Sequence, residues 1–219
     1  LPFSNIFINN TTLGVAADQN GNYSLTNIPV GLNEIVFSFV GYQSGFKNTS
    51  HYNSFFGFES GYNNTSGRSN VYLGHRAGYG NAVGATGSYN FFGGQYSGYK
   101  LTSGSNNVFL GYYSGHENTE GLNNIFLGNE SGKENETGDY NTYIGFQSGM
   151  LGGDVTTSDP SFNTFIGYQS GMNNRSGTYN TYIGYRAGYS GIGASASNNV
   201  MIGINSGYDI STGSSNVFL

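Results

Sequence analysis

A short phrase with two glycines recurs along most of this chain and constrains its fold more than any other feature. Residues 164–171 read TFIGYQSG, and residues 181–188, seventeen positions later, read TYIGYRAG. The first glycine of the phrase stands at positions 41, 57, 74, 94, 111, 128, 145, 167, 184 and 203. A second glycine follows four residues after each of these. Such a period is typical of repeat proteins, in which one structural unit stacks on the next.

The length of the period selects among the repeat architectures. Successive first glycines are 16 to 22 residues apart, most often 17. This is too short for a helix pair or a propeller blade and suits one coil of a β-solenoid. No window has the apolar spacing of a helix, so we predict an all-β protein, a parallel β-solenoid of about ten coils. With two short strands and two turns per coil, coils stacked at roughly 4.8 Å would form a rod of about 45 Å.

Small and turn-forming residues occupy fixed places in each repeat. From Asn53 onward, an asparagine opens the phrase four residues before the first glycine, and Ser or Ala always precedes the second glycine. Asn and Gly adopt left-handed backbone angles more readily than other residues, which indicates that they form the corners of the coil. The small residue beside the second glycine indicates a close backbone approach.

The strand predicted between the asparagine and the first glycine is apolar on both faces, a pattern typical of a strand that is buried on both sides. Its first and third residues are mostly aliphatic or β-branched, and its middle residue is aromatic or Met. We expect one face to line the narrow core of the coil and the middle residues to pack against other copies of the chain. The predicted interface residues are Phe55, Tyr72, Phe92, Phe109, Phe126, Tyr143, Phe165, Tyr182, Met201 and Phe218. The alternative is that the N-terminal segment or long loops cover this stripe.

Composition and motifs give little support to catalysis. Only 9% of the chain is charged, its net charge is −5, and it contains no cysteine for disulfides or thiolate metal sites. Seven scattered Lys and Arg residues provide no basic patch for nucleic acid, and no apolar run is long enough for a membrane-spanning helix. His51, His75 and His116 fall at different repeat positions, so we interpret them as turn or surface residues. We therefore predict no catalytic, cofactor-binding or metal-binding residues.

Two further features are candidates for binding. Carboxylates gather in the middle loops and could hold Ca²⁺ through oxygen ligands, although their spacing fits no calcium-binding motif and favours a solvated surface. These residues are Glu117, Glu120, Glu130, Glu134, Glu136 and Asp139. Three repeats are longer than the rest, and their additional residues fall within 79–89, 150–162 and 189–198. Insertions at one place in the repeat emerge on one side of a solenoid, where they could form a recognition surface or represent tolerated drift.

The repeats, over residues 41–219, resemble the head repeats of trimeric autotransporter adhesins and the similar repeats of tail-fibre-like proteins. The resemblance rests on the order Asn-Thr-aromatic-Ile-Gly, then two residues and Ser/Ala-Gly. It implies a left-handed parallel β-roll that assembles as a homotrimer and is exposed on a surface, with binding distributed over its loops. The period is longer than in the adhesin heads, and an aromatic stands where they often have a small residue.

The N-terminal segment differs from the repeats. Residues 13–43 resemble the small β-sandwich related to the carboxypeptidase regulatory domain, with strands over Thr12–Asp18, Tyr23–Leu25 and Glu34–Val40 and a hairpin turn at Asn20-Gly21. We accordingly divide the chain into a partial sandwich, residues 1–44, and solenoid repeats, residues 45–219. An incomplete sandwich has open edges, which predicts strand complementation with a neighbouring subunit. A chain cut within the domain is the other interpretation.

Together these features favour a non-catalytic, structural or adhesive fibre segment at the cell surface or outside the cell. Such a segment is expected to be homo-oligomeric and to bind surface glycans. Because its terminal coils lack caps, it is also expected to associate end to end into filaments. One alternative is a glycan-binding or glycan-acting solenoid, although glycoside hydrolysis needs a close pair of carboxylates that the repeat positions do not supply. Another is an ice-binding protein. In the column before the aromatics, however, Thr occurs only at positions 142, 164 and 181.

Overall fold

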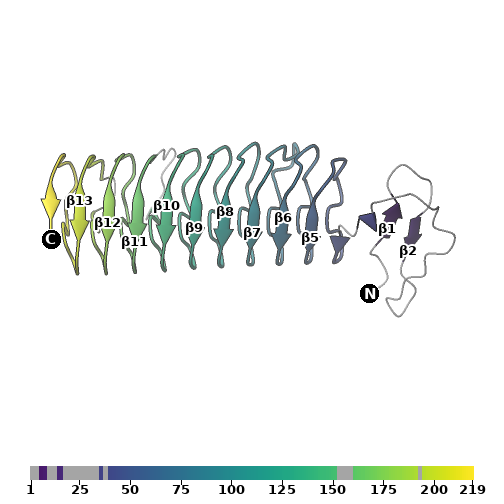
Figure 1. The fold of residues 1–219 in the computed structure, drawn as a ribbon, viewed down its shortest axis with the longest axis horizontal. Coiled ribbons are helices and arrows are strands. Elements are labelled where there is room, and N and C mark those ends of the chain that lie inside the picture. The colour runs from purple at the N-terminus through teal and green to yellow at the C-terminus, as the bar shows by residue number, and fades with distance from the viewer. Residues whose placement is uncertain (1–4, 9–13, 17–34, 37–38, 152–159, 192–193) are drawn as a thin grey trace.

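The computed structural model describes residues 5–8, 14–16, 35–36, 39–151, 160–191 and 194–219. All regular secondary structure in these residues is β, arranged as a three-stranded antiparallel sheet and an eleven-stranded parallel sheet. The parallel sheet runs along a β-solenoid, with its strands stacked side by side down the rod (Figure 1). The predicted all-β parallel solenoid is therefore confirmed.

The small sheet lies near the start of the chain. Strand β1 (Asn5–Ile8) pairs antiparallel with β2 (Gly14–Ala16) and with β3 (Ile35–Val36). Both β2 and β3 lie within predicted strands, whereas β1 is not predicted from the sequence. The predicted hairpin turn at residues 20–21 and the strand at 23–25 lie outside the described residues.

Each coil contributes one strand to the large sheet, and every strand pairs in parallel with the equivalent strand of the next coil. The strands are β4 (Phe39–Val40), β5 (Ser54–Phe56), β6 (Val71–Leu73), β7 (Phe91–Gly93), β8 (Val108–Leu110), β9 (Ile125–Leu127), β10 (Thr142–Ile144), β11 (Thr164–Ile166), β12 (Thr181–Ile183), β13 (Val200–Ile202) and β14 (Val217–Phe218). The register pairs residues of equivalent repeat positions: Phe109 of β8 is level with Phe126 of β9, and Tyr143 of β10 is level with Phe165 of β11. Equivalent residues therefore form columns that run the length of the rod.

The prediction of two strands per coil is wrong for the described repeats, which have one strand of two or three residues and otherwise turns. Left-handed backbone angles explain this difference. In one coil, Asn106 and Tyr113 have φ values of 60° and 56°, and equivalent residues of the other coils repeat them. These angles bend the chain too sharply for a second strand. The turns still bond to the next coil, since the Gly115 N–H donates to the Ser131 carbonyl at 3.0 Å.

Both glycines have positive φ, which agrees with the prediction that they form corners, and both are also required by close approach. A Cβ on Gly57 would lie 2.4 Å from the carbonyl oxygen of Gly74 in the next coil. A Cβ on Gly115 would lie 2.5 Å from the ring of Phe109 in its own coil. The first glycine therefore allows coils to stack, and the second closes the turn over the core.

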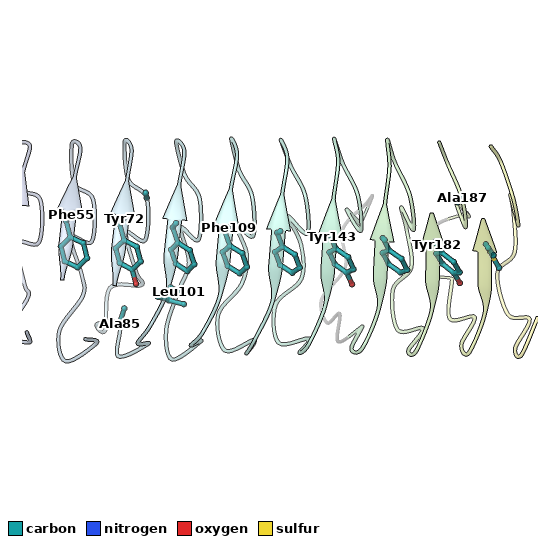
Figure 2. Close-up of a cluster of buried hydrophobic side chains, with 13 residues drawn as sticks. Phe55, Tyr72, Ala85, Leu101, Phe109, Tyr143, Tyr182 and Ala187 are labelled. Carbon is teal, nitrogen blue, oxygen red and sulfur yellow. The ribbon is translucent and has the colours of Figure 1, made fainter. Parts of the chain in front are cut away.

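The core is a single file of aromatic side chains, one from the middle of each strand (Figure 2). Rings of adjacent coils stack with centroids 4.7–4.9 Å apart and planes within 10° of parallel. We call this set the inner ring column: Phe55, Tyr72, Phe92, Phe109, Phe126, Tyr143, Phe165, Tyr182 and Met201. All of its members are at most 2% exposed within a single chain.

The predicted oligomer interface at these nine side chains is therefore wrong. A coil with one strand has a cavity about one ring wide, and the middle residue of the strand fills it. Side chains that are already buried within their own chain cannot contact another copy. Phe218, the tenth predicted interface residue, lies in β14 and is 37% exposed.

Polar ladders flank the ring column inside the rod. The backbone N–H of Asn107 donates to Oδ1 of Asn90 in the preceding coil, at 2.9 Å, and its own Oδ1 accepts the N–H of Asn124 at 2.8 Å. The Asn107 amide also donates to the Gly121 carbonyl at 2.7 Å. Beside the second glycine, Ser114 Oγ donates to the Phe126 carbonyl at 3.0 Å. The recurrent asparagines and serines thus tie each coil to its neighbours.

Candidate functional site

The outer surface of the parallel sheet is the broadest candidate for binding. Because side chains alternate along a strand, inward-pointing rings require the residues on either side to point outward. These positions form two columns, which we call the outer sheet face. The first column is Ser54, Val71, Phe91, Val108, Ile125, Thr142, Thr164, Thr181, Val200 and Val217, and the second is Phe56, Leu73, Gly93, Leu110, Leu127, Ile144, Ile166, Ile183, Ile202 and Leu219.

The outer sheet face is apolar and in contact with solvent. All of its members are half-buried or exposed, and Leu73, Ile125 and Ile202 are each about 40% exposed. It contains no Asp, Glu, Lys, Arg or His along its described length. Single exposed apolar residues are common, but an uncharged stripe over a whole rod is larger than the patches monomers usually leave in water.

Aromatic columns flank this face over three consecutive coils. On one side, Phe162 stacks on Tyr140 and Tyr179 at 5.1 and 4.9 Å, and on the other, Tyr168 stacks on Phe146 and Tyr185 at 5.3 and 5.2 Å. All six residues are exposed. Because Phe162 and Tyr168 are each stacked on both neighbouring rings, these middle rings leave their edges rather than their faces for a ligand.

A third aromatic column lies on the turn after the second glycine. Tyr62, Tyr79 and Tyr99 stack in sequence, with centroids 5.3 and 5.1 Å apart, and His116 continues the stack at 5.1 Å from Tyr99. The guanidinium of Arg76 lies 5.5 Å from the centre of the Tyr79 ring. The faces of these rings are therefore also covered by neighbours, most of them from the next coil.

A group of charged side chains lies around Glu117. Its carboxylate contacts Nδ1 of His116 at 2.7 Å and also pairs with the ammonium of Lys100. Burial alone would raise the pKa of Glu117, but hydrogen bonds and charge from His116 and Lys100 outweigh burial and lower this pKa to about 2. A carboxylate held ionised by two partners is suited to stabilising the turn rather than to transferring protons.

Glu134, in the next coil, shows the opposite behaviour. Burial raises the pKa of its carboxyl to about 7, although Lys133 lies 3.6 Å away and the Leu151 N–H donates to the carboxyl at 3.1 Å. Glu134 is not joined by other carboxylates or imidazoles into a metal-binding group. No cluster of three such side chains suited to a metal ion occurs in the described residues.

The histidines are distributed along the rod, as their repeat positions predict. His51 lies edge-on to Tyr52, with ring centres 6.2 Å apart. His75 lies between Phe58 and Tyr96, at 5.3 and 5.1 Å, and its ring nitrogen is 3.2 Å from the amide of Gln95. Neither ring is near a pair of carboxylates within the described part of the chain.

In two of the long repeats, the additional residues project from the rod at the same point of the coil. Isolated parallel bridges join Asn64 to Ala85 and Asn174 to Ala194, at equivalent points after an insertion. Within the first insertion, Val83 is 93% exposed, and Asn81 Oδ1 accepts its N–H at 3.0 Å. Residues 152–159, which belong to the third long repeat, and residues 192–193 lie outside the described residues. The two described cases agree with insertions that emerge on one side.

Comparison with known protein families finds a match, which lies at the beginning of the chain. Residues 1–59 match the family model of the CarboxypepD_reg-like domain. No curated protein and no solved structure matches the sequence or the fold. The chain thus combines an N-terminal segment that is similar to the CarboxypepD_reg-like domain with a β-solenoid. The likeness to adhesin heads and tail fibres remains a prediction, as does the division at residues 44 and 45.

The outer sheet face was not predicted from the sequence, because the inward and outward faces of the strand are reversed relative to the prediction. One signal in the sequence could have found it. The asparagine, the ring and the first glycine are alternate residues, and side chains at such positions share a face of the strand. An asparagine that recurs in every coil fits an interior hydrogen-bond ladder, and the ring two residues later must then point inward as well.

Proposed function

We propose that this protein is a non-catalytic, stiff segment of a fibre or adhesin on the cell surface or outside the cell. The observation that carries the proposal is the set of ladders that run along the rod. Rings, asparagines, serines and backbone bonds repeat from coil to coil over about nine coils. A rod held together in this way over its whole length is suited to setting a distance and displaying surfaces along it.

The arrangement of acidic groups favours a structural role over glycan hydrolysis. Retaining and inverting glycosidases need two carboxyl groups about 5 to 10 Å apart on either side of a bound sugar. Here Glu117 pairs with Lys100 and His116, and Glu59 pairs with Arg76. These carboxylates are therefore committed to basic partners.

The aromatic columns likewise give little support to glycan binding by ring stacking. A sugar that stacks on an aromatic side chain needs access to the face of the ring, whereas the middle rings of the exposed columns present edges. We retain homo-oligomerisation as part of the proposal, with a trimer as the state that the resemblance to adhesin heads implies.

Stiffness can be tested directly because the chain has no cysteine to remove. Phe58 and Ile204 are exposed and occupy the same repeat position, eight coil steps apart. Spin labels on the double variant Phe58→Cys/Ile204→Cys should give one narrow distance distribution near 40 Å, from about 4.8 Å per step. A broad distribution in native buffer would contradict a stiff rod.

A further inference from the structure

We propose that the outer sheet face binds the same face of a second copy of this chain, so that two rods lie back to back. This inference rests on the proposed rod and names its partner. The contact predicted from the sequence used the inner ring column; the contact proposed here uses the two outward columns of the same strands. It also predicts pairs rather than the trimers that the resemblance implies.

The size of the outer sheet face matches what a stable pair needs. Nine steps of about 4.8 Å give a length of about 43 Å, and the three-residue strand with the side chains that flank it on both sides gives a width of about 20 Å. The product is on the order of 900 Å² per copy, close to the roughly 800 Å² that each partner buries in a standard interface. The two columns, most of whose side chains are aliphatic and half-exposed, with Thr, Ser and Phe among them, would be removed from water over this area.

The period of the face favours a second copy over an unrelated protein. Sheets that pack face to face lie about 10 Å apart and interdigitate their side chains. In this rod, the outward side chains recur once per coil in strict register, from Ser54 beside Val71 to Val200 beside Val217. A second copy presents the same period over the whole length, whereas a partner with another spacing would fall out of step within a few coils.

The absence of charge on the described face points to the same occupant. A partner with charged groups at this surface would lose their hydration without gaining an opposite charge. The outer sheet face itself, being uncharged, carries no such penalty when it meets its own copy. The charged pairs around Glu59 and Glu117 lie outside its two columns.

Two copies, rather than three, follow from the shape of the coil. Each coil has one strand, so each described chain offers one flat sheet surface. Contact of that surface with its own copy is isologous and closes with two chains. A ring of three would need two such apolar surfaces on each chain.

Matched lysine variants test the pairing. Ile166 lies on the outer sheet face, and Met172 lies on a turn of the same coil; both are half-buried. In sedimentation velocity, wild type should have about twice the 23.4 kDa chain mass. Ile166→Lys should weaken association by about 100-fold, because it buries unpaired charge, whereas Met172→Lys should sediment as wild type. Circular dichroism identifies any variant that fails to fold, and Thr164→Lys then replaces Ile166→Lys.

Single cysteines give an independent readout. With a short bis-maleimide, Thr142→Cys, near the middle of the outer sheet face, should form a covalent pair of chains much faster than Met172→Cys. A monomeric or trimeric wild type, or equal behaviour of the two lysine variants, would overturn the pairing. So would a monomer whose outer sheet face instead confers thermal hysteresis or retention on a crystalline polysaccharide. The spin-label distance on the same protein separates these outcomes from failure of the rod itself, since a monomeric rod keeps its narrow distribution near 40 Å at about 4.8 Å per step.

Discussion

The two faces of each short strand in this protein follow different rules. The inward residue is aromatic in nearly every described coil, and from β5 onward the residue two before it is always Asn. The outward residues range from Ser and Thr to Val, Ile, Leu and Phe, with Gly at position 93. Both faces are apolar, but only the inner one repeats a single chemical type.

This difference shows what stacking requires. Inside the rod, each ring must meet a ring above and below, and each asparagine must bond to the asparagine of the next coil. A change at one level therefore disturbs two neighbours. On the outward face, the sequence requires only that the residue be uncharged and no larger than Phe. This is sufficient for a contact with another surface that excludes water.

The largest contrast is expected from truncating one residue on each face of β8. Phe109→Ala should lower the free energy of unfolding by about 3 to 5 kcal/mol, because it leaves a cavity between two stacked rings. Leu110→Ala, on the outward side, should cost less than about 1.5 kcal/mol in the monomer, because its side chain is half-exposed. Urea unfolding at low protein concentration measures both. Equal losses would remove the distinction between the faces.

The asparagine ladder supplies the second contrast. Asn107→Asp should cost about 2 to 3 kcal/mol at pH 7, since a buried carboxylate cannot donate to the Gly121 carbonyl. Burial should raise the pKa of this Asp in the folded state. The lost stability should then return as the pH falls through the folded pKa towards that of the unfolded chain. Asn106→Asp, on an exposed neighbour, is the control and should show little of this dependence.

The three inner tyrosines predict sensitivity to alkali. Burial raises the pKa of Tyr72, Tyr143 and Tyr182, in the case of Tyr182 to about 12, and nearby Asn amides oppose this only in part. The unfolded chain ionises near pH 10, so stability should be complete below that pH. Above it, up to about pH 12, stability should fall by about 1.4 kcal/mol per pH unit for each tyrosine. The triple Tyr→Phe variant should match wild type at pH 7 and lose this slope. A slope unchanged in the variant would show that these hydroxyls are not buried.

The smallest effect concerns an outer turn. Because the folded pKa of Glu134 is raised to about 7, its contribution should be complete below the unfolded value and should diminish as the pH rises to 7. Glu134→Gln should therefore raise stability at pH 8 relative to wild type, by on the order of 1 kcal/mol after allowance for partial exposure. Thermal unfolding at pH 5 and pH 8 compares the two proteins. A variant that is less stable at pH 8 would mean that the pairing with Lys133 outweighs burial.

The repeat predicted the fold well because stacking imposes its rules on single residues. The glycine positions, the strand between Asn53 and Gly57 and its equivalents, and the parallel register all follow from the period. The number of strands per coil could not be predicted, because non-glycine residues such as Tyr113 adopt left-handed angles without a compositional signal. The inward and outward faces were confused because hydrophobicity alone does not separate an aliphatic column that lies outside from a ring column that lies inside.

The central claim, that the rings form the core of each single chain, can be tested by oxidative footprinting with mass spectrometry. Phe109 is fully buried, and Tyr112, three residues later, is 45% exposed. In protein diluted until it sediments as a monomer, hydroxyl radicals should modify Tyr112 and leave Phe109 protected. Modification of Phe109 that increases on dilution to the monomer would place the rings between chains and contradict the account.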